Sequence, residues 1–168
     1  MKKVLYIYGY NSNENSETRS NLQEVLGPDI IVDSVYYEQC QPNEAIEYLS
    51  NVAEKYDAVI GSSLGGFYAL KIEFNGPRVV INPCMMPSVE LPKIGCAKEI
   101  ADRFTPYQTY ERNDVFTFGF FGNHDELIDY REKFVNEVSC NVTIFDSGHR
   151  PTLAELKDIS KMIWNLIM

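Results

Sequence analysis

Short apolar runs that alternate with helical segments constrain the fold of this chain more than any other feature. Residues 4–8 form a continuous apolar run rich in β-forming side chains, and residues 58–60 and 79–81 repeat the pattern. Such runs are typical of strands buried on both faces, as in parallel sheets. Further strands are predicted at residues 30–35, 115–121 and 142–145.

The segments between these strands carry helical signals. Residues 42–56 place apolar side chains every three or four positions, which is the pattern of an amphipathic helix. Thr152 and Glu155 have the spacing of a capping box at the start of the last helix. The other predicted helices end near residue 26, cover residues 67 to about 74, and run from about 128 to 138. We therefore expect an α/β fold with a mostly parallel sheet, helices on both faces and one domain over residues 1–168.

Residues 83–113 are the least readable part of the chain. This segment has prolines close together and only weak periodicity, so we expect an irregular insertion that forms a pocket rim, a lid or a contact surface. Met85 and Met86 within it are candidates for lining an acyl-binding site, although ordinary packing is the simpler explanation of both.

Composition and charge exclude several function classes. The net charge is −9, so the surface repels phosphate backbones and anionic bilayers, and we expect neither a nucleic-acid nor a membrane partner. The first apolar run is too short for a signal peptide, which favours a cytoplasmic protein. The four cysteines are widely spaced without a metal-binding pattern, and we expect reduced thiols.

The strongest chemical signal is Gly61-x-Ser63-x-Gly65, placed between a predicted strand and an apolar helix. This spacing is that of a nucleophile elbow, in which a tight turn raises a serine hydroxyl above the sheet edge. The glycines allow the turn because it has no room for side chains beside the serine. The Leu64 N–H, at the start of the helix, is then available to stabilise an oxyanion. A plain glycine-rich turn or a phosphate-binding loop is the alternative.

A serine nucleophile requires a base and an acid that orients the base. His149 follows the last predicted strand, which is where the base lies in the chain order Ser, acid, His; His124 is the rival. Asp125 comes directly after the preceding strand and is our choice for the acid. The competing carboxylates are Glu126, Asp129 and Asp146, and a metal site using both histidines and Asp125 is a weaker alternative.

A second oxyanion donor is expected from the loop after the first strand. Gly9 lets the backbone approach a substrate closely, so the Tyr10 N–H is the predicted donor, with Tyr8 and Gly9 lining the site. Simple aromatic packing explains Tyr8 and Tyr10 equally well.

Several motifs in this order resemble the YqiA-like family of small α/β-hydrolase-fold esterases. The resemblance covers the N-terminal segment 5–12, the elbow 61–69, Ile81-Asn82-Pro83, the acid-bearing segment 125–131 and Gly148-His149. It implies esterase activity on small acyl esters or thioesters, without a metal or organic cofactor, on a compact fold with little or no lid. This chain has Tyr8 where the family usually has histidine, and Met86 where an arginine is common.

The residues together predict a serine hydrolase that acts on a small-molecule acyl ester or thioester. Ser63 attacks, His149 transfers the proton, Asp125 orients the imidazole, and the Leu64 and Tyr10 amides hold the oxyanion. Two alternatives stay open: acyl transfer to an acceptor other than water, and a binding or regulatory protein on the same fold, which Tyr8 motivates. The natural substrate and the oligomeric state do not follow from the sequence.

Overall fold

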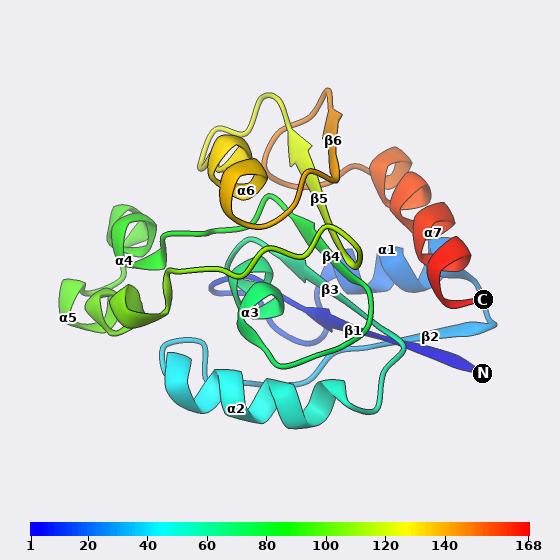
Figure 1. The fold of residues 1–168 in the computed structure, drawn as a ribbon, viewed down its shortest axis with the longest axis horizontal. Helices are drawn as coiled ribbons and strands as arrows, with labels where there is room; N and C mark the ends of the chain where they lie inside the picture. Colours follow the sequence, from blue (N-terminus) through cyan, green and yellow to red (C-terminus); the bar gives the residue numbers. More distant parts are fainter.

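A single six-stranded sheet, entirely parallel, organises the molecule (Figure 1). The computed structural model describes all 168 residues. The strands lie in the order β2-β1-β3-β4-β5-β6. Their bounds are Lys2–Ile7 (β1), Ile30–Asp33 (β2), Ala58–Ser62 (β3), Arg78–Ile81 (β4), Thr117–Gly122 (β5) and Val142–Phe145 (β6). The three strands with continuous apolar runs, β1, β3 and β4, occupy adjacent interior positions, as two-sided burial requires.

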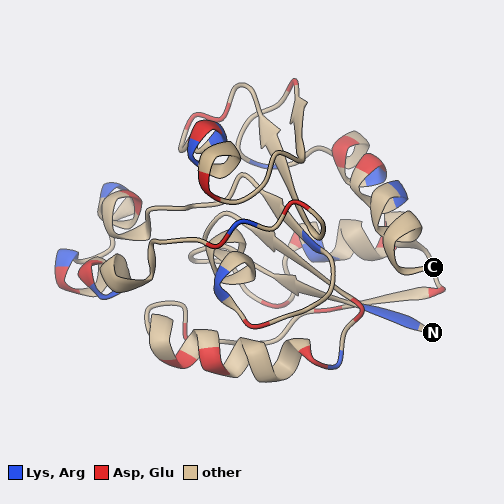
Figure 2. Ribbon diagram, in the orientation of Figure 1, with Lys and Arg blue, Asp and Glu red and all other residues tan.

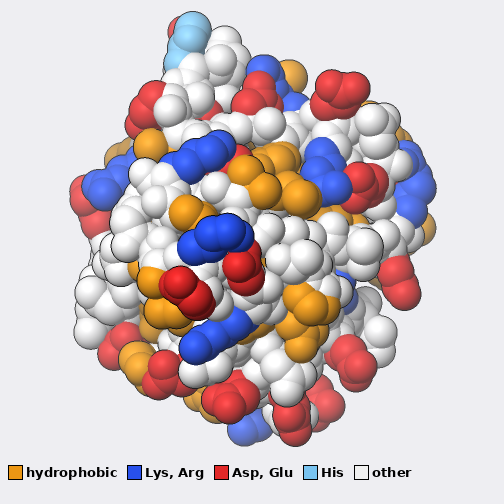
Figure 3. Space-filling view, turned by 90° about the vertical axis from the view of Figure 1, so that its left-hand side faces the viewer, with side chains coloured by type: hydrophobic (Ala, Val, Ile, Leu, Met, Phe, Trp, Pro, Cys, Tyr) orange, Lys and Arg blue, Asp and Glu red, His pale blue; other side chains and the backbone are white.

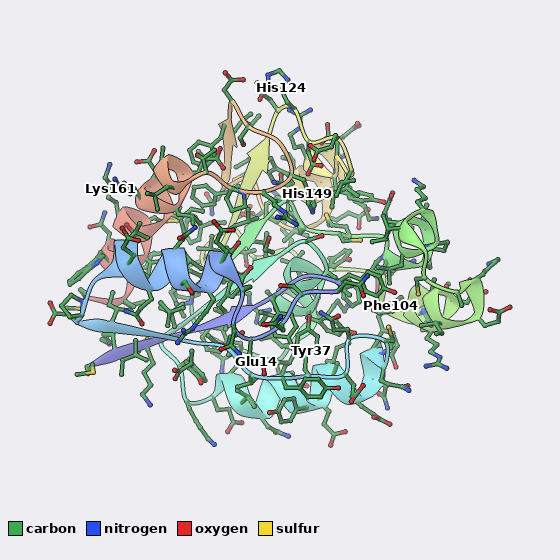
Figure 4. All side chains as sticks on the ribbon, turned by 180° about the vertical axis from the view of Figure 1, so that it is seen from behind. Glu14, Tyr37, Phe104, His124, His149 and Lys161 are labelled. Carbon is green, nitrogen blue, oxygen red and sulfur yellow. The ribbon has the colours of Figure 1, made fainter.

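Helices cover both faces of this sheet. On one face α1 (Glu17–Leu26) packs against α7 (Leu153–Ile167), and Figure 4 shows both in front of the strands. On the other face α3 (Leu64–Lys71) contacts β1, β3 and β4 and packs against α2 (Pro42–Ala53), in front in Figure 1. The predicted α/β class with helices on both faces is therefore confirmed.

The last helix begins where the capping box predicted. Thr152 Oγ1 accepts a hydrogen bond from the Glu155 N–H, and the Glu155 carboxylate accepts one from the Thr152 N–H, each at 3.3 Å. The N-terminal N–H groups of a helix have no partner within the helix, so this reciprocal pair fixes the start of α7.

The strand predicted at 115–121 begins two residues later, at Thr117. The cause is a side-chain turn: Asn113 Oδ1 accepts hydrogen bonds from the N–H groups of Val115 and Phe116. Those donors are therefore unavailable to the sheet, and the strand begins only after them.

The helix predicted over 128–138 is shorter than expected, and α6 spans Arg131–Glu137. Asp125 Oδ1 accepts hydrogen bonds from the N–H groups of Leu127 and Ile128, at 2.8 and 3.0 Å. This local turn holds the chain out of the helical conformation immediately after the predicted catalytic acid.

The segment 83–113 consists of short helical turns beside the carboxyl edge of the sheet, on the left in Figure 1. These are α4 (Pro87–Glu90), η1 (Leu91–Ile94), α5 (Lys98–Ala101) and η2 (Asp102–Tyr107). The fully buried Phe104 ties the segment to α3, because its ring lies 5.4 Å from that of Phe67. The segment is thus packed onto the domain by an aromatic contact.

The buried hydrophobic side chains form one cluster of 37 residues around the sheet. Apolar burial of this kind is the main favourable term in folding. No helix in the structure combines the length and the hydropathy needed to cross a bilayer.

The crowding at Gly65 yields a test of how the turn after β3 is held. A Cβ atom at this position would lie 2.0 Å from the Ile7 carbonyl oxygen, so Gly65→Ala forces the backbone apart. We expect Gly65→Ala to lower the free energy of unfolding by about 3 kcal/mol, although alanine is the better helix former. Urea unfolding measures this change.

Gly95→Ala is the matched control. Gly95 has a φ of +97°, and a Cβ atom added there would meet no atom within 4 Å, so only its left-handed backbone is affected. The expected cost is about 1–2 kcal/mol. Equal losses of unfolding free energy in the two variants would show that the clash of the added Cβ atom with the Ile7 carbonyl carries no extra cost at Gly65.

Candidate active site

Ser63 occupies the sharp turn between β3 and α3, in a backbone conformation that is unusual for serine. Its φ is 55° and its ψ is −118°, and the positive φ is strained for a residue with a Cβ atom. Backbone hydrogen bonds hold the strained residue: its N–H donates to the Ile81 carbonyl, and its carbonyl accepts from Gly66 and Cys84. Ser63 is half-buried, so its side chain keeps a route to solvent.

The two glycines of the motif allow β3, α3 and β1 to approach one another closely. A Cβ atom on Gly61 would lie 2.2 Å from the Gly65 carbonyl oxygen, and one on Gly65 would overlap the Ile7 carbonyl. Neither position can accept a side chain without a shift of backbone. The flanking glycines are therefore required by packing, as the motif predicted.

His149 and Asp125 form a hydrogen-bonded pair. His149 Nδ1 lies 2.7 Å from Asp125 Oδ2, and the two side chains are 13% and 2% exposed. Pairing through Nδ1 assigns the proton to that nitrogen and leaves Nε2 as the basic atom. The structure thus joins the predicted base to the predicted acid across 24 positions of sequence.

The carboxyl group of Asp125 is held in its ionised form. Burial by itself would raise its pKa, but hydrogen bonds from His149 and from the N–H groups of Ile128 and Leu127 outweigh that effect. Its pKa therefore lies below the ordinary value. The same N–H groups fix the direction in which the carboxylate points.

Asn82 connects the loops that carry these groups, and sequence reasoning assigned it no role. It directly follows β4, and its side-chain amide donates to the carbonyl oxygens of His149 and Gly148, at 2.8 and 3.3 Å. Its Oδ1 accepts from the Gly122 N–H, at 2.9 Å, at the end of the strand that precedes Asp125. Because Ser63 donates to Ile81, the residue before Asn82, this amide links the base loop to the turn at Ser63.

One signal in the sequence could have identified Asn82. It is a polar residue placed directly after a continuous apolar run, at the carboxyl end of an interior strand. Its φ of 42° also lies in the left-handed region, where asparagine is tolerated better than most residues.

The loop after β1 lies beside the turn at Ser63. A Cβ atom on Gly9 would be 3.2 Å from Ser63 Cβ and 3.9 Å from the Leu64 nitrogen. Gln39 orders this loop through hydrogen bonds to the Gly9 carbonyl and from the Asn11 N–H.

Two backbone donors are free near Ser63. The neighbouring N–H groups of Asn11 and Ser12 are already bonded within the protein, whereas that of Tyr10 donates to no protein group. Leu64 is the first residue of α3, so the helix supplies no acceptor for its N–H.

The other predicted residues lie in different surroundings. Tyr8 and Met85 are buried in the core, 2% and 0% exposed, and do not present their side chains to a substrate. Met86 is half-buried at the start of the segment 83–113.

The side chains of the rival base and the rival acids make no hydrogen bond to the His149 ring. His124 projects from the tip of the molecule in Figure 4 and pairs with Asp146, with side chains 70% and 85% exposed. Glu126 accepts a hydrogen bond from the His149 backbone N–H, and Asp129 pairs with Arg131.

The structure does not bring the Ser63 hydroxyl, the His149 ring and a large cavity together. The Ser63 hydroxyl makes no hydrogen bond to the His149 ring, whose partner in the structure is Asp125. A large cavity of about 980 Å³ lies near the amino ends of β4 and β5, around Arg78 and Thr117, and none of the residues Ser63, His149 and Asp125 lines it.

Comparison with known proteins supports the fold. The model of a family described as "Uncharacterised protein family (UPF0227)" matches residues 3–168. Est1E from Butyrivibrio proteoclasticus, in a structure with ferulic acid bound, superimposes with a TM-score of 0.71 at 13% identity, covering 99% of this chain and 90% of Est1E.

Two further structures show the same fold. SOBER1 from Arabidopsis thaliana has a TM-score of 0.63 at 12% identity, with 99% of each chain covered. The esterase domain of a Rhodothermus marinus protein has a TM-score of 0.63 at 11% identity, covering 96% of this chain and 84% of that domain. At these identities the likeness establishes the α/β-hydrolase fold.

The low pKa of Asp125 predicts how stability depends on pH. A carboxyl group whose pKa is depressed by folding stabilises the protein above its unfolded pKa of about 3.9, and this contribution is lost as the pH falls through the folded value. Asp125→Asn should therefore reduce the free energy of unfolding near about pH 7, and its difference from wild type should shrink below about pH 4. Urea unfolding over a pH series measures both.

Asp146→Asn serves as the control, since Asp146 forms only an exposed pair. We expect it to change the free energy of unfolding by less than about 0.5 kcal/mol. A constant difference between Asp125→Asn and wild type down to acid pH would contradict the ionised pair.

Asn82→Ala should destabilise the protein by about 2–3 kcal/mol, because it leaves backbone groups of Gly122, Gly148 and His149 without their partner. Asn82→Gly should cost a similar amount, since glycine tolerates the positive φ but lacks the amide. Asn123→Ala, in an exposed position, should stay within about 0.5 kcal/mol of wild type. Chemical denaturation of the three variants tests this, and a stable Asn82→Gly would rule out the bridging role.

Proposed function

The chain belongs to the UPF0227 family, the YqiA family that its motifs resemble, and from this premise we propose that it is a serine hydrolase of small acyl esters or thioesters. The observation that carries the proposal is the buried His149–Asp125 pair, 2.7 Å apart, tied through Asn82 to the strained turn at Ser63. A nucleophile, an oriented base and free backbone donors at one sheet edge are the parts that acyl transfer requires.

The first half of the reaction forms an acyl-enzyme. Ser63 Oγ attacks the carbonyl carbon while its proton passes to His149 Nε2, and Asp125 stabilises the imidazolium through Nδ1. The bond to the leaving group then breaks, and His149 returns the proton to the departing alcohol or thiol. In many free enzymes the catalytic hydroxyl and imidazole are too far apart for a good hydrogen bond, and the bond tightens only when substrate binds. The absence of a bond between Ser63 and His149 is therefore compatible with the reaction.

Water completes the reaction, and the same catalytic groups act in the opposite order. It attacks the acyl-serine, loses a proton to His149, and the carboxylic acid leaves as Ser63 recovers its hydrogen. During both halves negative charge develops on the carbonyl oxygen. The free Tyr10 N–H and the Leu64 N–H at the positive end of α3 are the donors that we assign to this oxyanion.

The substrate class follows from what surrounds Ser63. Ser63 is partly exposed, and the segment 83–113 begins beside it, where the Cys84 N–H donates to the Ser63 carbonyl. We infer a small, neutral acyl group; Est1E, a structural neighbour, is described with an aromatic acid bound. Transfer of the acyl group to an acceptor other than water uses the same first half-reaction and is distinguished by product analysis.

A fluorophosphonate probe tests the nucleophile directly. We expect covalent labelling of the wild type and of Ser62→Ala, and no labelling of Ser63→Ala, detected by intact-mass spectrometry. With a short-chain p-nitrophenyl ester, kcat/KM should fall by at least about 10³-fold in both Ser63→Ala and His149→Ala. His124→Ala should keep near wild-type activity, because His124 pairs only with the exposed Asp146.

Labelling that persists in Ser63→Ala would refute the assignment of the nucleophile. If no variant and no wild-type protein is labelled or active on a panel of acyl chain lengths, the binding-protein alternative replaces the hydrolase.

A further inference from the structure

A second pocket, of about 270 Å³, lies between the end of β2 and the start of α2. Its walls are aromatic and acidic, and none of its lining residues belongs to the triad. The lining residues are Tyr36, Tyr37, Glu38, Glu44, Ala45 and Tyr48.

Three tyrosine rings line this pocket and are held at different depths. Tyr36 and Tyr48 are 62% and 46% exposed, and the Tyr36 hydroxyl donates to Glu38. Tyr37 is buried, donates to the Tyr8 carbonyl at 2.6 Å, and packs against the rings of Tyr8 and Tyr68. The pocket therefore has one fixed ring at its base and two solvent-facing rings at its rim.

The charged side chains that line this pocket are both negative. Glu38 and Glu44 line the pocket, and no lysine or arginine does. None of the ion pairs in the structure includes either carboxylate. The adjoining helix α2 carries acidic but no basic residues, as Figure 2 shows. Figure 3 shows mostly acidic side chains, with one basic group among them, along the lower margin of the molecule.

A third carboxylate extends this negative field. Glu14, in the loop before α1, is labelled near Tyr37 in Figure 4 and belongs to none of the ion pairs. Burial raises the pKa of the Tyr8 hydroxyl, and the charges of Glu14 and Glu38 raise it further. The pKa of Tyr36 is raised by its hydrogen bond to Glu38 and by the charge of that carboxylate. Carboxylates thus outnumber cations near the tyrosines: Arg103, which donates to the Cys40 carbonyl, is the basic side chain bonded to the loop that carries Glu38.

The pocket is connected to the candidate active site through one loop. Tyr37 holds the Tyr8 carbonyl, and Gln39 holds the Gly9 carbonyl at 2.6 Å. Gly9 in turn lies against Ser63. Tyr37, which lines the pocket, therefore also holds the segment that supplies the predicted oxyanion donor.

We propose that this pocket binds an organic ammonium group carried by the alcohol part of the ester substrate. Aromatic faces attract cations through their quadrupole, and they favour diffuse, weakly hydrated ammonium groups over strongly hydrated inorganic ions. Unpaired carboxylates at the rim add attraction of the same sign. The inference rests on the proposed function, since the small acyl group is assigned to the space at Ser63 and the cation to the leaving alcohol.

Direct binding tests the pocket apart from catalysis. Tetramethylammonium is titrated into Ser63→Ala protein and followed by NMR chemical shifts, with neopentyl alcohol as the neutral probe of similar shape. We expect saturable shifts with tetramethylammonium and none with the alcohol. Tyr48→Ala and the double variant Glu38→Gln/Glu44→Gln should each weaken binding at least about 5-fold, as loss of a cation–π or charge contact implies.

Glu47→Gln is the matched control. It removes one exposed negative charge from the same helix but does not line the pocket, so the affinity should stay within about 2-fold of wild type. Equal weakening by Glu47→Gln would reduce the effect to general surface charge and overturn the site. Absence of saturable tetramethylammonium binding would do the same.

A pair of esters then tests the source of the cation. The acetate of 2-(trimethylammonio)ethanol is compared with its carbon isostere, 3,3-dimethylbutyl acetate, in wild type and in Tyr48→Ala. We expect kcat/KM to favour the cationic ester by about 10-fold or more in wild type and by about 2-fold or less in Tyr48→Ala, which corresponds to loss of one cation–π contact.

The outcomes separate the two proposals. Hydrolysis of both esters at equal rates leaves the hydrolase in place and overturns the ammonium-bearing substrate, even if tetramethylammonium binds. Hydrolysis of neither ester, together with no labelling of Ser63, defeats the proposed function, and with it the substrate assignment. Tetramethylammonium binding in that case would support a site for a free ammonium ligand.

Discussion

The close crossing of β1, β3 and α3 is the constraint on which the rest of the molecule depends. Gly61 and Gly65 let backbone meet backbone there, and a methyl group at either position would overlap a carbonyl group. This approach forces Ser63 into a positive φ, and the hydrogen bonds from Ser63 to Ile81 and from Cys84 to Ser63 hold it. Strain at one residue is tolerated because the surrounding interior strands, buried on both faces, leave no alternative path for the chain.

Polar side chains extend this order from the turn to the neighbouring loops. Asn82 lies one residue beyond the acceptor of the Ser63 N–H and binds the base loop and the end of β5 with a single amide. Asp125 performs a comparable double task, since one carboxylate oxygen meets His149 and the other forms the local turn. Each side chain satisfies backbone groups that would otherwise be unpaired at the sheet edge, so the geometry of the site and the stability of the loops have a common origin.

The electrostatics of the carboxyl edge are uneven. The His149–Asp125 pair is shielded from solvent, whereas the tyrosine pocket at the start of α2 is open and lined by carboxylates. The overall charge of −9 is the reason that the surface repels polyanions, but it does not by itself create such a pocket. What makes this region distinct is the combination of exposed aromatic rings with acids that form no ion pair. Gln39 and Gly9 join it to the turn at Ser63.

Local signals in the sequence were sufficient for the strand and helix order, the elbow at Ser63 and the capping box at Thr152, because each depends on residues a few positions apart. They failed where a side chain captured backbone donors, as Asn113 does before β5 and Asp125 does before α6. They also passed over Asn82, whose partner His149 is 67 positions away. Residue types along the chain determined which chemistry is available; the strand order of the folded sheet decided which acid meets the histidine and which loops share one amide, since such contacts exist only after distant segments pack together.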